Sequence, residues 1–394
     1  MFNLKPSPAD PSPFEREAHR IADPLERLRY LRKHVPASVV LPEPEVSPAE
    51  LFVPAKPKLW RFALAGLAIV AIAGGGYAWL GQRPAEKPAP VVHAIPAPGP
   101  TPNHIWQVQL TQTEEVYSNG LRIDLSFATR NRPRAEYPIY AMESAAPIGT
   151  GNTPLGIVYH TTESDMAPFE EDATKQLKTL GHLLLQYIRR EHSYHYLIDR
   201  FGRVYRVVEE SDAANHAGFS VWSDDRGVYV NLNDSFIGVA FEGSTNQREE
   251  ITAAQVSAAR ALTELLREHY SIAAENCVTH AQVSVNPLNM KLSNHTDWAR
   301  EFPFAALNLP DNYTRPIAAV EAFGFEHDEV LTGLSGGKDW AGLRISDQRL
   351  REAAASQGAT EWRYRGMLRH RYQEILAELK RQQAERDAAA AKGK

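Results

Sequence analysis

The sequence contains a single cysteine, Cys277, among 394 residues, which excludes an intramolecular disulfide framework and a cysteine-rich zinc cluster. It also lacks an excess of basic residues: 43 Lys and Arg stand against 48 Asp and Glu, for a formal net charge of −5. Without a basic field, the chain is not expected to bind nucleic acid. Its 23% charged and 43% hydrophobic residues are typical of a globular protein, and its length predicts two or three structural units.

Charge is absent from one apolar run, Phe62 to Leu80, and this absence predicts a transmembrane helix. At ~1.5 Å per residue, such a helix covers a hydrocarbon core of ~30 Å. Trp60 and Trp79 lie at its ends, where aromatic side chains favour the headgroup level. A cleaved signal peptide is a poor alternative because the preceding region is far too long. Basic residues before the run favour a cytoplasmic N-terminus.

Composition and turn signals divide the chain into further segments. The region before the apolar run is rich in proline and charge and is predicted to be largely flexible. A proline- and alanine-rich spacer follows the run, and Asn119-Gly120 then separates two alternating runs, as in a β-hairpin. The predicted segments are 1–57 (cytoplasmic, flexible), 58–82 (transmembrane helix), 83–104 (linker), 105–154 (β-hairpin lead-in), 155–315 (catalytic domain) and 316–394 (helical extension).

Residues 155–315 alternate apolar strand patterns with amphipathic helical ones, which predicts an α/β domain with a central mixed sheet flanked by helices. The predicted strands are 157–160, 194–199, 204–208, 237–241 and 277–280, and the predicted helices are 172–190 and 252–270. The second helix opens with a capping box, Thr252 and Gln255.

The C-terminal extension is predicted to be helical over 346–356 and 360–389. Apolar residues recur at helical spacing in the second of these helices, at Leu368, Tyr372, Ile375 and Leu379. Packing against the catalytic domain is one interpretation of this stripe, and a docking site for a helical partner is the other.

Polar residues that can bind zinc or move protons follow several of these strands, where ligands bind in open α/β sheets. His160 and His280 are the first two candidate zinc ligands, and zinc hydrolases need about three. Cys277 lies an odd number of residues from His280, so within a strand the two side chains point to opposite faces. We therefore assign Asp297 to the metal and place His295, two residues earlier, beside it.

In order along the chain, these segments resemble the type-2 N-acetylmuramoyl-L-alanine amidases, a family that shares its fold with the peptidoglycan-recognition proteins. The resemblance covers roughly residues 155–304. The motifs that carry it are "VYHTTES", "YHYLIDRFGRVYRVVEE", "NHAG", "SFIGVAFEG", "THAQVS" and "NHTDW". It implies a zinc enzyme that cuts the bond between the lactyl group of N-acetylmuramic acid and L-alanine, with peptidoglycan or muropeptides as its partners.

The resemblance also implies roles for individual residues. His160, His280 and Asp297 take the zinc-ligand places. Glu242 takes the place of a catalytic carboxylate, and Tyr194 that of a tyrosine used in other branches of the family. His295 stands where the family often has lysine, and we predict that it stabilises the oxyanion.

Two further residues, His216 and Trp222, are candidates for lining a sugar or peptide groove, with core packing as the alternative. A non-catalytic wall-binding module on the same fold is the alternative function. The filled ligand places favour the enzyme, which the apolar run would anchor in the inner membrane with its catalytic domain in the periplasm.

Overall fold

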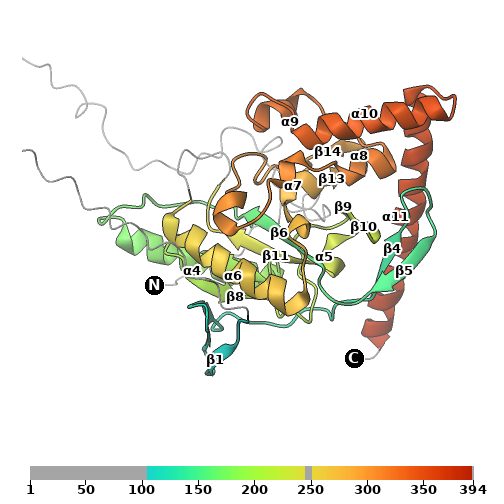
Figure 1. Cartoon of the computed structure of the whole chain (residues 1–394). Coiled ribbons are helices and arrows are strands. Elements are labelled where there is room, and N and C mark those ends of the chain that lie inside the picture. Colours follow the sequence, from blue (N-terminus) through green and yellow to red (C-terminus); the bar gives the residue numbers. More distant parts are fainter. Residues whose placement is uncertain (1–103, 245–250, 393–394) are drawn as a thin grey trace, which may run out of the picture. The chain divides into compact units, whose positions relative to one another are not determined.

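The computed structural model describes residues 104–244 and 251–392, all of which belong to one compact unit that begins at Pro96 (Figure 1). The predicted cytoplasmic segment, the apolar run 62–80 and nearly all of the linker lie outside the described residues. Within 104–244 and 251–392, no helix is both long enough and apolar enough to cross a membrane.

An eight-stranded mixed sheet forms the centre of the unit, in the order β1-β2-β3-β8-β7-β11-β6-β12. The four strands at one side, β7, β11, β6 and β12, run parallel, whereas β8 pairs with β7 antiparallel. In sheet order the strands are Gln107–Leu110, Glu114–Tyr117, Arg122–Asp124, Val204–Arg206, Tyr196–Ile198, Phe236–Phe241, Gly156–Thr161 and Cys277–Thr279. The predicted class, a central mixed sheet flanked by helices, is confirmed.

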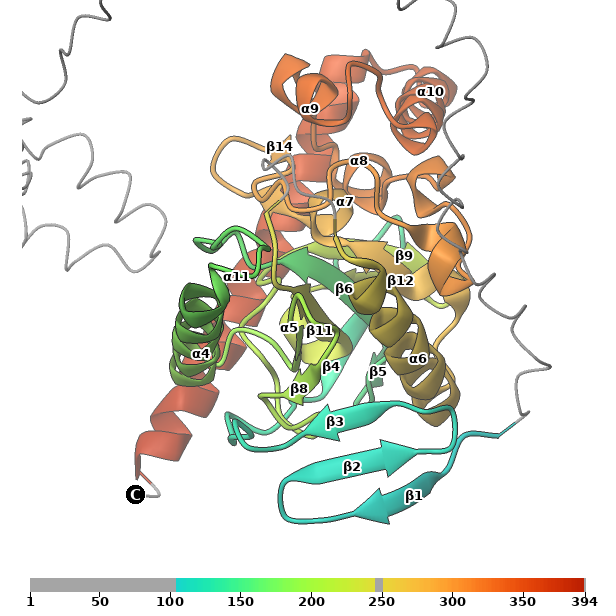
Figure 2. The same ribbon diagram turned by 90° about the vertical axis from the view of Figure 1, so that its left-hand side faces the viewer.

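Helices cover both faces of this sheet (Figure 2). Strands β6 and β11 are buried along their whole length, which suits their continuous apolar sequences. Helix α6 (Ala253–Tyr270) packs on Tyr159 and Val239, and helix α4 (Thr174–Glu191) packs on the opposite face around Ala240. The predicted capping box opens α6, since the Thr252 side chain accepts from the Gln255 N–H and the Gln255 side chain from the Thr252 N–H.

The lead-in hairpin is an integral part of the sheet. Its predicted turn is confirmed at Asn119-Gly120, between β2 and β3, with Gly120 at φ +86°. Strand β3 pairs in parallel with β8, and Glu115 of β2 forms an ion pair with Arg206 of β8 at 2.7 Å. The hairpin therefore extends the central sheet through a long-range strand pairing that the local sequence pattern did not reveal.

A second sheet and several short elements complete the fold. The sheet has the order β5-β4-β10-β9, with strands Pro147–Gly151, Tyr137–Tyr140, Gly227–Val230 and Val221–Asp224. The predicted lead-in, 105–154, thus contains β4 and β5 of this second sheet in addition to the hairpin. The short elements are α5 (Leu232–Ser235), η3 (Ala274–Asn276), α7 (His280–Val283), β13 (Val285–Asn286), β14 (Lys291–Leu292), η4 (Phe304–Leu307) and η5 (Asn312–Thr314).

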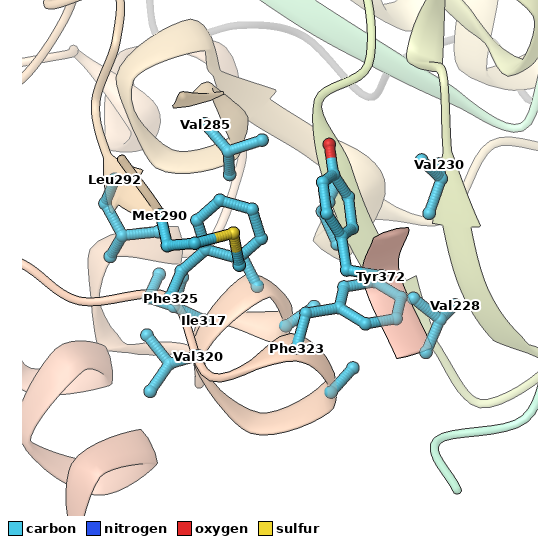
Figure 3. Packing of buried hydrophobic residues seen from close by; sticks show 14 of the residues in the cluster. Val228, Val230, Val285, Met290, Leu292, Ile317, Val320, Phe323, Phe325 and Tyr372 are labelled. Atoms are coloured by element: carbon cyan, nitrogen blue, oxygen red, sulfur yellow. The ribbon is translucent and has the colours of Figure 1, made fainter. Parts of the chain in front are cut away.

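The C-terminal helices pack on the rest of the unit. They are α8 (Ala318–Phe323), α9 (Glu329–Leu334), α10 (Ala341–Ser356) and α11 (Glu361–Lys392). The α11 stripe of Leu368, Tyr372, Ile375 and Leu379 is buried in one hydrophobic cluster that also holds strand residues Val228 and Val230 (Figure 3). The prediction that this stripe packs within the protein, against residues that precede 316, is therefore confirmed. The partner interpretation loses its basis, because this apolar face is already covered.

Candidate metal centre and active site

Three predicted ligands meet at the edge of the sheet where parallel strands β6, β11 and β12 end. His160 lies near the end of β6, opposite Ala240 of β11. His280 was expected at the end of a strand, but it is the first residue of the short helix α7 that follows β12. The chain then passes through the β13–β14 hairpin and returns with Asp297, whose carbonyl accepts from the Ala281 N–H at 3.1 Å.

The three side chains converge, with the Nδ1 atom of each imidazole facing one carboxylate oxygen of Asp297. His160 Nδ1 lies 3.0 Å from Asp297 Oδ2, and His280 Nδ1 lies 2.9 Å from Asp297 Oδ1. Donor atoms about 2.1 Å from a tetrahedral zinc are ~3.4 Å apart, a few tenths of an ångström more than this spacing. All three residues are buried, and one potential ligand atom from each lies within 4.8 Å of the other two. Two imidazoles and one carboxylate in this arrangement fit a zinc ion.

As predicted, Cys277 is not one of the candidate metal ligands. Its side chain is buried in the cluster under α6, with Ile157 and Tyr159, on the face of the sheet away from His160. Burial raises the pKa of the thiol to about 12, so the thiolate that a metal would require is not formed near neutral pH.

Electrostatics hold His160 and Asp297 in the protonation states that a metal needs. Burial, followed by the neighbouring His280, lowers the pKa of His160 to about 4, so this imidazole is neutral at pH 7. Burial opposes ionisation of Asp297, but His280 and His160 outweigh it and hold the pKa of the carboxyl well below its usual range. Neutral imidazole and ionised carboxylate are the forms that bind zinc.

His216 is buried behind the centre, so the structure does not support its predicted place in a substrate groove. Its Nδ1 lies 3.2 Å from His160 Nε2, and its Nε2 lies 3.3 Å from the carbonyl of Phe236. A carbonyl only accepts, so His216 Nε2 carries the proton and Nδ1 accepts from His160 Nε2–H. The Nδ1 lone pair of His160 is thereby directed at the metal position. In metal sites, a group that accepts a hydrogen bond from the second ring nitrogen of a histidine ligand commonly fixes the tautomer and orientation of that ligand.

A continuous row of histidine rings runs through this part of the fold. Ring centroids are 5.6 Å apart for His195 and His216, 5.3 Å for His216 and His160, 4.4 Å for His160 and His280, and 4.6 Å for His280 and His295. His195 Nδ1 accepts the Gly238 N–H at 2.9 Å. A Cβ on Gly238 would lie 2.6 Å from His216 Cγ, so β11 needs glycine here to let the ring approach.

Trp222 does not line a groove either. It is 1% exposed and packs with Phe236 and Val278, and its indole N–H donates to Asn276 Oδ1 at 3.0 Å. The side chain is therefore a core residue with a satisfied polar atom, and it has no surface to offer a sugar.

Two of the predicted catalytic residues border the trio directly. The His295 ring stacks on His280 with an interplanar angle of 16°, and the Tyr194 ring lies 5.0 Å from that of His160. Burial raises the pKa of the Tyr194 phenol well above its usual range, so the phenol is a hydrogen-bond donor at neutral pH. Both side chains therefore lie beside the candidate ligands, His295 against His280 and Tyr194 against His160.

Glu242 directly follows the last residue of β11, at the same edge of the sheet as His160. It is 7% exposed, and its Oε2 accepts the Arg200 N–H at 3.1 Å. Helix α4 passes over it, with a Cβ built on Gly181 lying 3.9 Å from Oε1. Burial raises the pKa of Glu242, and the nearby Asp199 adds to the effect. A carboxyl with a raised pKa suits proton transfer near neutral pH.

Glu163 is a carboxylate at this edge that the sequence reasoning did not single out. It follows β6 with φ at +47°, and its two oxygens accept from the hydroxyls of Thr161 and Ser244 at 2.5 and 2.7 Å. Its charge contributes to raising the pKa of Tyr194. Its position three residues after His160, in the polar stretch at the end of β6, is the sequence feature that could have identified it.

The fold and the centre define an α/β protein with three side chains at the edge of its sheet that could together hold a metal ion. Residues 150–299 match the family described as "N-acetylmuramoyl-L-alanine amidase". The match contains all three ligands. The comparison with curated proteins gave no match.

Solved structures of amidases are similar to this domain. The amidase LysC from Clostridium intestinale is 22% identical, over 40% of this chain and 86% of its own, with a TM-score of 0.23. AmiD from E. coli is 23% identical, over 49% of this chain and 64% of its own, with a TM-score of 0.29. Citrobacter freundii AmpD is 26% identical, over 39% of this chain and 78% of its own, with a TM-score of 0.23.

Proposed function

We propose that the protein is a membrane-anchored zinc amidase that hydrolyses the amide bond between N-acetylmuramic acid and L-alanine in peptidoglycan. The observation that carries the proposal is the coincidence of the family match over 150–299 with the buried trio of His160, His280 and Asp297. A module that only bound the wall would not need a complete set of three metal ligands.

The roles of the chain's own residues follow from their positions. His160, His280 and Asp297 hold the zinc, which supplies Lewis acidity toward water and the scissile carbonyl. Glu242 accepts the proton of the attacking water and passes it to the departing alanine amine, as its raised pKa favours. His295, stacked on His280, donates a hydrogen bond to the carbonyl oxygen as negative charge develops there.

The tyrosine beside His160 provides a second donor. Tyr194 holds its proton at neutral pH and lies against the ring of a ligand, so its hydroxyl can share the stabilisation of the oxyanion or orient the substrate amide. The non-catalytic module remains the second candidate function. It differs from the enzyme in one testable respect: it would bind wall fragments without changing them.

Mass spectrometry of purified peptidoglycan, incubated with the full-length protein, separates the two. The enzyme releases stem peptides with a free L-alanine amine and leaves the lactyl group on the glycan. Chelation should abolish this release and zinc should restore it, whereas Asp297→Asn should be inactive under both conditions. Unchanged peptidoglycan that nevertheless pulls down the zinc-loaded protein would establish the binding module instead.

We further propose that residues 62–80 anchor the chain in the inner membrane, with its N-terminus cytoplasmic and the catalytic domain periplasmic. The uncharged apolar run and the basic residues before it support this orientation. A reporter that is active only outside the cytoplasm should be active when fused after Asn103. Activity only from a fusion before Lys56 would reverse the orientation.

A further inference from the structure

The segment between His280 and Asp297 is held by residues that lie beyond the family match. Its β13–β14 hairpin contributes Val285, Met290 and Leu292 to the hydrophobic cluster of the C-terminal helices, where they meet Phe325 (Figure 3). The hairpin is also bonded to the chain before α9, since Glu326 accepts from the Leu292 N–H at 2.8 Å.

The backbone that carries Asp297 is strained. Ser293, Trp298 and Glu301 all have positive φ, at 52°, 59° and 59°, although none is glycine. Non-glycine residues rarely adopt this left-handed conformation, and they keep it only where surrounding contacts impose it. Trp298 directly follows Asp297, so whatever holds its backbone also sets the direction of the ligand carboxylate.

Two aromatic side chains supply those contacts. The Tyr313 hydroxyl donates to the carbonyl of Trp298 at 2.5 Å, and the Trp340 indole N–H donates to the carbonyl of Ala299 at 3.0 Å. The two rings stack on each other, with centroids 5.3 Å apart and an interplanar angle of 27°. The carbonyls of the two residues after Asp297 are thus both held by one stacked pair.

We infer that Tyr313 and Trp340 form a clamp that positions Asp297 and thereby sets the affinity of the centre for zinc. The clamp makes the C-terminal region, beyond residue 299, part of the metal site although it supplies no ligand. This inference rests on zinc binding by the trio, as in the proposed function. Tyr313 and Trp340 are positioning residues, since they act through the backbone of the ligand loop.

The C-terminal region offers a matched control for each member of the clamp. Tyr372 also donates its hydroxyl to a backbone carbonyl, that of Phe219 at 3.2 Å, which is not part of the loop that carries Asp297. Trp362 is 83% exposed. Tyr313→Phe and Tyr372→Phe therefore each remove one phenol-to-carbonyl bond, and Trp340→Phe is compared with Trp362→Phe.

The test is the zinc dissociation constant of the purified full-length chain, measured by competition with a chromogenic chelator. Loss of a group that orients a ligand typically weakens metal binding 10- to 100-fold. We expect about tenfold weaker binding for Tyr313→Phe and Trp340→Phe and no change for the two controls. Hydrogen exchange of the backbone amides at 297–301 should accelerate in Tyr313→Phe and not in Tyr372→Phe.

Two results overturn the clamp. One is a folded Tyr313→Phe protein with the zinc affinity and amide protection of the parent. The other is an equal loss of zinc affinity in Tyr372→Phe. That result would show that both variants loosen the C-terminal region in general, without a specific action on Asp297. If the parent protein itself binds no zinc, the proposed function fails together with the clamp. If the parent binds zinc but the variants bind it equally well, only the clamp fails.

Discussion

Replacing Gly238 by alanine perturbs the metal centre without altering any ligand. The new Cβ would lie 2.6 Å from His216 Cγ, whereas ordinary contact begins near 3.4 Å, so the ring must move by about 0.8 Å. His216 is held to His160 by a 3.2 Å contact, and a shift of this size breaks it. Losing one such bond costs ~0.5–1.5 kcal/mol, which corresponds to a two- to tenfold weaker affinity for zinc. Overpacking would cost a further ~1–3 kcal/mol of stability.

The assay is chelator competition on folded protein, with thermal unfolding measured in parallel. Gly149→Ala is the control, because Gly149 also lies in a strand and a Cβ there meets nothing within 4 Å. We expect Gly238→Ala to bind zinc about fivefold more weakly and to unfold at lower temperature, and Gly149→Ala to do neither. A folded Gly238→Ala protein with unchanged zinc affinity would refute the role given to His216.

Three further outcomes are expected. His280→Ala should lose most of its zinc, measured by elemental analysis after dialysis, and full occupancy would contradict the ligand assignment. Glu242→Gln should keep its zinc but lose at least ~100-fold in the rate of amide hydrolysis, and Tyr194→Phe should lose less; the reverse order would transfer the proton-transfer role to Tyr194. The hydrogen bond with Asp347 raises the pKa of His327, so this pair stabilises the fold fully below about pH 6.5 and less as the pH rises through the raised value. Thermal midpoints of His327→Asn should therefore fall below those of the parent at pH 6 and approach them at pH 9, and a constant difference would contradict this.

Local patterns were sufficient to predict the elements that carry the ligands. Strands β6 and β11 read as continuous apolar runs, and the capping box marked the start of α6. Because parallel strands end at a common edge, polar residues after them could be expected to meet there, as His160 and His280 do. The hairpin turn at Asn119-Gly120 was equally local. Its pairing with β8 was not, since no short-range pattern encodes which distant strand it joins.

The sequence by itself determined the secondary structure around the centre and the residue types available for its chemistry, because periodicity, capping and strand ends are properties of neighbours in the chain. Tertiary structure alone decided which side chains are accessible and which contact one another. It buried His216 behind His160 and Trp222 in the core, and it brought Tyr313 and Trp340 against the loop of Asp297. These outcomes depend on the packing of segments far apart in the chain, which the order of residues within any one segment does not specify.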